Sequence, residues 1–295
     1  MRGLSETFMT SLKSGFLSGI TKQVIKDSDL DLEIRDNYIN VYYKGNSLLK
    51  LTEKPNSDCY EVTIDPKFKE GLKDFPSDLK DKEATKIFLD NIPRLKQNIV
   101  YYGDRMKEAE YEQMIIRANN YEDNINSEYF IIDKHPYMGN SGEANIFDLL
   151  GFYWDRNHRK IKYKEVPLCL IEVKFGRNQD ISKIHEQIQR YYNAIKLKFE
   201  TENFTEEMQK IFRQKLHLGL YIQDQKRLEL MKTLMFSSDI SKFQIIIFLI
   251  DYNPNSTILE KNLKNLERLP FAGQIRIFFG GFAMWQQKLK LLADL

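Results

Sequence analysis

The stretch LCLIEVKF, residues 168–175, has the composition of a central β-strand, because apolar residues fill it almost from end to end. Two charged residues, Glu172 and Lys174, interrupt it. Side chains alternate between the two faces of a strand, so Glu172 and Lys174 project from one face and the odd-numbered side chains from Cys169 to Phe175 pack on the other. A buried strand carries charge only where something requires it.

A second apolar run, Asn145–Trp154, contains IFDLL at residues 146–150 and so carries one carboxylate, Asp148. If the two strands are neighbours, Asp148 reaches the face of Glu172 and Lys174. Two desolvated carboxylates there repel each other, and a Mg²⁺ ion, which prefers oxygen ligands, removes the repulsion. Lys174 is then placed to orient or deprotonate a metal-bound water, as phosphodiester hydrolysis requires. The alternative is a buried ion pair of Lys174 with Glu172 or Asp148, without catalysis.

A helix is predicted over Gln179–Phe199, where six apolar side chains form one stripe: Ile181, Ile184, Ile188, Tyr191, Ile195 and Phe199. Gln187 and Tyr191, four residues apart, share a helix side with Lys183 and could hold a phosphate backbone beside the metal. Tyr191 has a second interpretation, as part of the core. The surrounding segment 156–198 carries 11 Lys/Arg and 4 Asp/Glu, a positive balance that suits a polyanion or a solvated surface.

Asp148, followed after 23 residues by Glu172-Val173-Lys174, resembles the signature of the PD-(D/E)XK nuclease superfamily. Gln187-Ile188-Gln189-Arg190-Tyr191 resembles the Q-x-x-x-Y element of its RecB-like branch. Phe147 stands where the pattern has proline, and the resemblance covers about residues 107–198. It implies an α/β fold with a restriction-endonuclease-like mixed sheet flanked by helices. It also implies Mg²⁺-dependent cleavage of DNA, or less often of RNA, with Mn²⁺ able to substitute.

By the same resemblance, Asp148, Glu172 and the Val173 carbonyl hold the metal while Lys174 serves the water. Many members add an acid from the preceding helix. The candidates here are Glu108 and Glu112, and Glu112 is favoured because it lies nearer the first strand of this region. The predicted substrate-binding residues are Gln187, Tyr191, Lys183 and Arg177.

For residues 1–75, the N-terminal quarter of the chain, the sequence predicts a separate α+β lobe of unknown role. The nuclease-like domain is predicted to follow at residues 76–295. The lobe comprises a helix, Thr7–Lys26, and a β-meander, with the boundary in the charged segment Lys67–Lys82. The meander strands are Leu30–Arg35, Tyr38–Tyr43, Ser47–Thr52 and Cys59–Ile64. Further on, a helical pattern runs from Glu83 to Arg117, where Pro93 begins or kinks a second segment. The other predicted elements are strands at Tyr129–Ile132, Leu216–Ile222, Phe243–Asp251 and Gln274–Phe279, and a helix near Leu259–Leu269.

Several classes of protein are excluded by what the sequence lacks. It has no P-loop motif, its two cysteines are too few for a disulfide framework or a four-ligand zinc site, and its four histidines show no metalloprotease spacing. With no secretory leader and no apolar run longer than Ile245–Ile250, we expect a cytoplasmic protein without a membrane partner.

The function predicted from sequence is a Mg²⁺-dependent deoxyribonuclease that acts in restriction, repair or defence. The alternatives are an RNase with the same site, or a catalytically silent protein of the same fold that binds nucleic acid or docks a partner. A homodimer, or a protein partner bound through the N-terminal lobe, is compatible with each of these functions.

Overall fold

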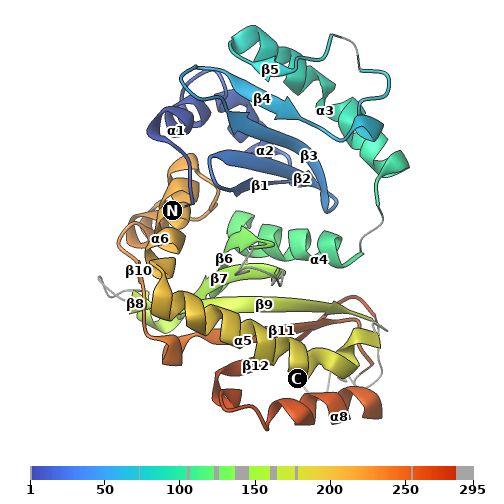
Figure 1. Ribbon diagram of the computed structural model, residues 1–295, viewed down its shortest axis with the longest axis vertical. Helices are drawn as coiled ribbons and strands as arrows, with labels where there is room; N and C mark the ends of the chain where they lie inside the picture. Colours follow the sequence, from blue (N-terminus) through green and yellow to red (C-terminus); the bar gives the residue numbers. More distant parts are fainter. Residues whose placement is uncertain are drawn as a thin grey trace, which may run out of the picture.

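The computed structural model describes residues 2–72, 74–104, 107–122, 126–136, 146–159, 165–176, 179–253 and 255–283. The protein is a mixed α/β structure with two five-stranded sheets, one from the N-terminal third of the chain and one from the remainder (Figure 1). The α/β class predicted from sequence is confirmed. None of the helices in the described part combines the length and the apolar composition needed to cross a bilayer.

The first sheet is an antiparallel meander in the order β1-β2-β3-β4-β5. Its strands are β1 (Leu30–Ile34), β2 (Tyr38–Tyr43), β3 (Asn46–Glu53), β4 (Tyr60–Thr63) and β5 (Asp78–Leu79). The four predicted strands are confirmed, and β5 is an addition. β5 and helix α3 (Lys82–Tyr102) follow the predicted lobe boundary at residue 76, yet β5 extends this sheet and α3 packs on it.

The single helix predicted over Thr7–Lys26 is wrong, because two helices occupy that stretch, α1 (Glu6–Lys13) and α2 (Ser18–Lys26). The chain turns at Gly15, where an added Cβ would lie 2.8 Å from the Ser11 Cα, so the turn needs glycine. With this turn, both short helices bury their apolar sides in one core. Pro93 lies inside the continuous helix α3 and does not begin a new one; the break comes after Tyr102.

The second sheet has the order β12-β11-β9-β7-β6 and is mixed. Its strands are β6 (Tyr129–Lys134), β7 (Leu149–Tyr153), β9 (Leu168–Phe175), β11 (Gln244–Ile250) and β12 (Ile275–Gly280). β6, β7 and β9 pair antiparallel, whereas β9, β11 and β12 pair parallel. The predicted strands at these positions are confirmed, although β7 begins later than expected. A short parallel pair, β8 (Glu165–Val166) with β10 (Met235–Phe236), lies apart from this sheet.

Helices cover both faces of the second sheet (Figure 1). Helix α4 (Lys107–Ile116) packs on the face of Cys169, Ile171 and Val173, and a π-helical turn, Arg117–Tyr121, continues it. The opposite face of β9, with Leu168 and Leu170, belongs to the core that contains α5 (Ile184–Thr201). This alternation of the β9 side chains confirms the period-2 prediction. α8 (Thr257–Leu266) packs against α5 and fits the predicted helix near that position.

The strand predicted at Leu216–Ile222 is wrong, because α6 (Phe204–Leu218) occupies its first half. Gly219, with φ of 81°, ends the helix in the left-handed conformation. Leu220 and Tyr221 are buried beyond it, so the apolar run that suggested a strand is a helix end followed by a buried connection. α7 (Gln225–Met231) comes next.

A buried layer of charge joins the two sheets. On β1, Glu33 is fully buried and accepts a hydrogen bond from Lys215 of α6 at 2.7 Å. Arg35, the residue immediately after β1, pairs with buried Asp133 of β6. Gln113 of α4 donates to the Asp29 carbonyl at 2.7 Å. The first sheet and its helices therefore hold both β6 and α4 in place, and these two elements lead into the site described next.

Candidate metal centre

The structure brings Asp148 beside Glu172, as the sequence predicts. β7 runs antiparallel to β9 with Leu149 opposite Ile171, so Asp148, one residue before β7, stands across from Glu172. Asp148 lies in a bend immediately before the strand, whereas the sequence placed it inside the strand. The Val173 N–H donates to Asp148 Oδ2 at 2.7 Å and orients this carboxylate. The metal-binding role predicted for the Val173 carbonyl stays a prediction.

Glu172 and Lys174 project from the same face of β9 and form a close pair, with 2.6 Å between Lys174 Nζ and Glu172 Oε1. Both side chains are buried. The second oxygen, Glu172 Oε2, is also buried and has no hydrogen-bond donor within the described part of the chain. An unpaired buried carboxylate oxygen is costly, and a cation would satisfy it.

Gln187 and Tyr191, on one side of α5 as predicted, turn their polar groups toward the protein. Gln187 Nε2 lies 2.6 Å from Glu172 Oε1 and 2.8 Å from the Tyr191 hydroxyl, and donates to both. The Tyr191 hydroxyl donates in turn to the Ile146 carbonyl at 3.0 Å. This chain of hydrogen bonds fixes Glu172, and Tyr191 is at the same time part of the core. A contact of either residue with substrate stays a prediction.

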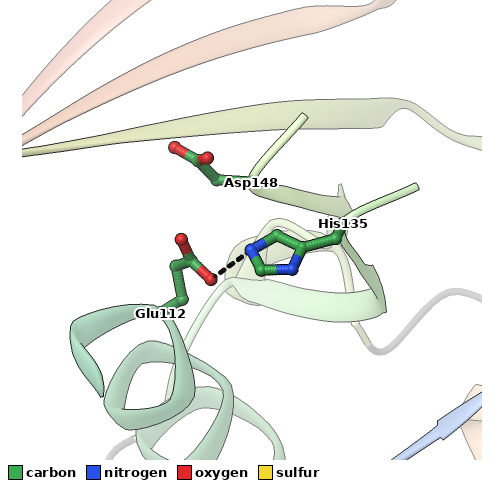
Figure 2. A group of neighbouring side chains, drawn as sticks. All are labelled: Glu112, His135 and Asp148. Carbon is green, nitrogen blue, oxygen red and sulfur yellow. Dashed lines mark ion pairs between the residues drawn. The ribbon is translucent and has the colours of Figure 1, made fainter. Parts of the chain in front are cut away.

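Within the described residues, the hydrogen-bond network of Gln187 and Tyr191 does not include Lys183, another predicted substrate residue. Lys183 is exposed at the N-terminal end of α5, and Arg177 lies outside the described residues. On α4, the two candidate acids separate: Glu108 Oε1 accepts the Phe175 N–H at 3.4 Å, whereas Glu112 is buried and turns toward Asp148 (Figure 2). Glu112 is therefore the candidate that lies near Asp148, and its role as an additional acid stays a prediction.

His135 is a further member of the site that the sequence did not single out. Figure 2 shows its imidazole beside the Glu112 carboxylate, on the same side of the site as Asp148, with Nε2 2.7 Å from Glu112 Oε2. One ligand atom from each of Glu112, His135 and Asp148 lies within 4.8 Å of the others. His135 follows β6, and its N–H donates to the Asp148 carbonyl at 2.8 Å. The pairing of β6 with β7 places this histidine in the site, and no local sequence pattern indicates that pairing.

The carboxyl groups of the site have strongly perturbed pKa values. Burial, with the charges of Glu172 and Glu112, raises the pKa of Asp148 well above its usual range. Burial also raises the pKa of Glu172, against the opposing effect of Lys174. For Glu112, burial is outweighed by His135 and Lys134, and its pKa falls. Such opposed shifts at one place are typical of functional sites.

Lys174 stays positively charged in this environment. Burial lowers its pKa, but the charges of Glu172 and Asp148 more than compensate and raise it above the ordinary lysine value. The site thus contains two carboxyl groups with raised pKa values, Asp148 and Glu172, a third with a lowered pKa, Glu112, and two lysine side chains, Lys174 and Lys134. Comparison with protein-family models, with curated proteins and with solved structures found no match.

Proposed function

We propose that this protein is a metal-dependent nuclease that hydrolyses phosphodiester bonds in DNA. The observation that carries the proposal is the pair of facing carboxyl groups, Asp148 and Glu172, with the Lys174 ammonium 2.6 Å from Glu172. Both carboxyl groups have raised pKa values, and a buried oxygen of Glu172 has no donor among the described residues. This donor set fits Mg²⁺, which takes one or two carboxylates and completes its shell with water and phosphate oxygens.

When bound, Mg²⁺ polarises a phosphoryl oxygen and lowers the pKa of a coordinated water. Asp148 and Glu172 would bind the ion, and Glu112 would offer a third carboxylate. Gln187 keeps Glu172 in its orientation, as partners of ligating groups commonly do. Lys174, beside Glu172, would orient the attacking water and, as an ammonium, stabilise the negative charge that grows on the phosphate. Deprotonation of the water by Lys174 is the other role considered from sequence.

Nucleic acid is the substrate class favoured by the charge of the chain segment that contains Glu172, Lys174 and Gln187. The segment 156–198, which includes β9 and most of α5, holds 11 Lys/Arg against 4 Asp/Glu. A polyanion is attracted by such a local excess even though the whole chain carries only +2. The mixed sheet and the Gln187–Tyr191 pair also support the resemblance to the restriction-endonuclease-like fold. RNA shares the phosphodiester chemistry and is the second substrate to test.

The test measures cleavage of supercoiled plasmid, linear duplex, single-stranded DNA and RNA with Mg²⁺, Mn²⁺ or EDTA. We expect DNA cleavage that EDTA abolishes and that Lys174→Ala lowers at least about 100-fold, as the loss of a charge-stabilising group typically does. The matched control is Lys264→Ala on α8, an exposed lysine outside the basic segment that pairs with Glu260. Equal degradation by wild type and Lys174→Ala would contradict the proposal, provided circular dichroism shows both folded.

A further inference from the structure

The face of the second sheet that carries α4 has a groove beside that helix. Helix α4 packs on β9 and β6, and the groove, of about 370 Å³, lies beyond it over β11 and β12. Its buried lining residues include Ile171, Ile246 and Ile250. Met114 of α4 and Phe278 of β12 also line it, and these two side chains are 46% and 55% exposed. Apolar side chains exposed around one hollow indicate a surface that another apolar surface covers.

The polar side chains that line this groove already have partners in the protein. The Tyr111 hydroxyl donates to Asp251 Oδ2 at 3.2 Å, and the Tyr129 hydroxyl donates to a glutamine of β11 at 2.9 Å. Arg276 and Asn119 donate to backbone carbonyls of their own segments. Sites for small molecules combine apolar walls with a few polar groups that orient the ligand. Here those groups are engaged, so the groove suits the apolar side chains of a polypeptide.

Asp251 fixes the chain at the edge of the groove. It follows β11 with φ of 56°, in the left-handed region that residues other than glycine seldom adopt. Its Oδ1 accepts the N–H groups of Phe282 and Ala283 at 2.6 and 2.7 Å, and Phe282 itself lines the groove. At Gly281, with φ of 117°, an added Cβ would collide with the Asp251 carboxylate, so this turn needs glycine. Residue 284 therefore begins directly beside the groove.

Residues 284–295, with the sequence MWQQKLKLLADL, lie outside the described residues, and their sequence has the pattern of an amphipathic helix. Six of the twelve side chains are large and apolar. At 3.6 residues per turn, Trp285, Leu289 and Leu292 share one side of a helix. The polar residues fall mostly on the opposite side: Gln286, Gln287, Lys290 and Asp294. Twelve helical residues extend about 18 Å, and the six residues of β12 extend about 20 Å, so the lengths match.

We infer that residues 284–295 bind as a helix in the apolar groove beside α4, with Trp285, Leu289 and Leu292 facing β11 and β12. This inference goes beyond the proposed nuclease function and does not depend on it. The hydrogen bonds of Asp251 tether the segment at the groove, and a tethered segment competes at a high effective concentration against a second copy of the chain. The bound segment covers the exposed side of α4, the helix that also carries Glu112 of the candidate metal centre.

Fluorescence of Trp285 in the full chain tests the inference. Trp154 is the only other tryptophan in the sequence, so the spectrum of wild type minus that of Trp285→Phe reports on Trp285. We expect this emission to be blue-shifted, and its quenching by acrylamide to be several-fold weaker than in the urea-unfolded chain. Emission and quenching equal to those of the unfolded chain overturn the inference.

A charge in the groove should release the segment. Met114→Lys introduces that charge on α4, and Val100→Lys is the matched control, an apolar residue 56% exposed on α3. With both variants folded by circular dichroism, Met114→Lys should shift the Trp285 emission to the red and raise its quenching several-fold, whereas Val100→Lys should leave both unchanged. Equal effects of the two variants overturn the inference.

The same measurement over a wide range of protein concentration, with light scattering for the molecular mass, identifies the occupant of the groove. Protection of Trp285 in a monomer, unchanged on dilution, is expected for a segment of the same chain. Protection that appears only in a dimer and is lost on dilution assigns the groove to a second copy and overturns the inference. None of these readouts involves cleavage of nucleic acid, so the two proposals fail separately.

Discussion

Replacing Asp148 by asparagine should stabilise the protein in the absence of a divalent ion and make it less stable than wild type in its presence. The carboxylate of Asp148 faces Glu172 and Glu112, and burial together with these two charges raises its pKa. Asparagine removes the charge but retains an oxygen that can accept the Val173 N–H, now at 2.7 Å from Oδ2. The substitution therefore relieves repulsion without breaking the hydrogen bond that orients the side chain.

The size of the effect follows from the separations in the site. Ligand atoms of Asp148 and Glu112 lie within 4.8 Å, so two full charges there repel by about 3.5 kcal/mol at an effective dielectric constant of about 20. Lys134 and Lys174 offset part of this repulsion, and proton uptake by Asp148 avoids another part. A net gain of about 2 kcal/mol remains, which corresponds to roughly 4 °C in Tm for a chain of this size.

The stability difference between Asp148→Asn and wild type should change with pH in a definite direction. Because the pKa of Asp148 is raised in the folded protein, the stability contributed by this group is complete below its unfolded pKa and is lost as pH rises through the folded one. The advantage of Asp148→Asn should therefore be absent in acid and grow toward pH 8. A control, Asp58→Asn at an exposed position of the first lobe, should show no such gain.

Thermal unfolding followed by circular dichroism, in EDTA and then with Mn²⁺ at about 100 times its Kd, measures both halves of the prediction. Saturation at that level stabilises wild type by about 2.7 kcal/mol, since the ion binds only the folded chain. The variant should gain far less, so the order of the two Tm values reverses. A lower Tm for Asp148→Asn in EDTA at pH 8, or equal gains with metal, would refute the reasoning.

Two further predictions concern residues that support the site. Gln187→Ala removes the amide 2.6 Å from Glu172 and should weaken metal binding about 10- to 100-fold in calorimetry. The control Gln189→Ala removes an amide that bonds Asn193 and should leave metal binding unchanged. Equal losses in the two variants would count against a positioning role for Gln187. Glu33, whose pKa burial raises to about 8 against the effect of Lys215, should cost wild type about 3 kcal/mol of stability as pH rises from about 4.5 to 7, at about 1.4 kcal/mol per pH unit. Urea unfolding should show this loss in wild type and not in Glu33→Gln, and a parallel loss in both would contradict the assignment.

The sequence alone predicted the α/β class, most strands of both sheets and the meeting of Asp148, Glu172 and Lys174. These features are local: an acid and a base two residues apart in an apolar strand share a face whatever the rest of the chain does. The Gln187–Tyr191 pair is local too, because four residues make about one helical turn. What their polar groups contact was not predictable, and Gln187 in fact donates to Glu172.

The features that escaped prediction depend on contacts between distant parts of the chain. His135 reaches the site because β6 pairs with β7, and nothing in its immediate neighbours distinguishes it from the other histidines. Helix α6 was missed because charged residues crowd it and one of them, Lys215, lies on its buried side. Lys215 is buried because Glu33, 182 residues earlier in the chain, accepts its hydrogen bond. Sequence periodicity cannot anticipate a lysine that packs as core.

The same long-range contacts make the first lobe part of the support of the metal centre. Glu33 Oε2 accepts the backbone N–H of Lys134 at 3.2 Å, and Arg35 holds the preceding residue, Asp133. Lys134 in turn balances Glu112, and His135 follows directly. Arg35 and Glu33 thus hold Asp133 and Lys134 in place. The next residue, His135, is held by its contacts with Asp148 and Glu112 in the metal centre. Without β1 and Arg35, which follows it, buried Asp133 would lose its ion pair with Arg35 and the Lys134 N–H would lose its acceptor, Glu33, which is strongly destabilising. The position of His135 therefore depends on the lobe.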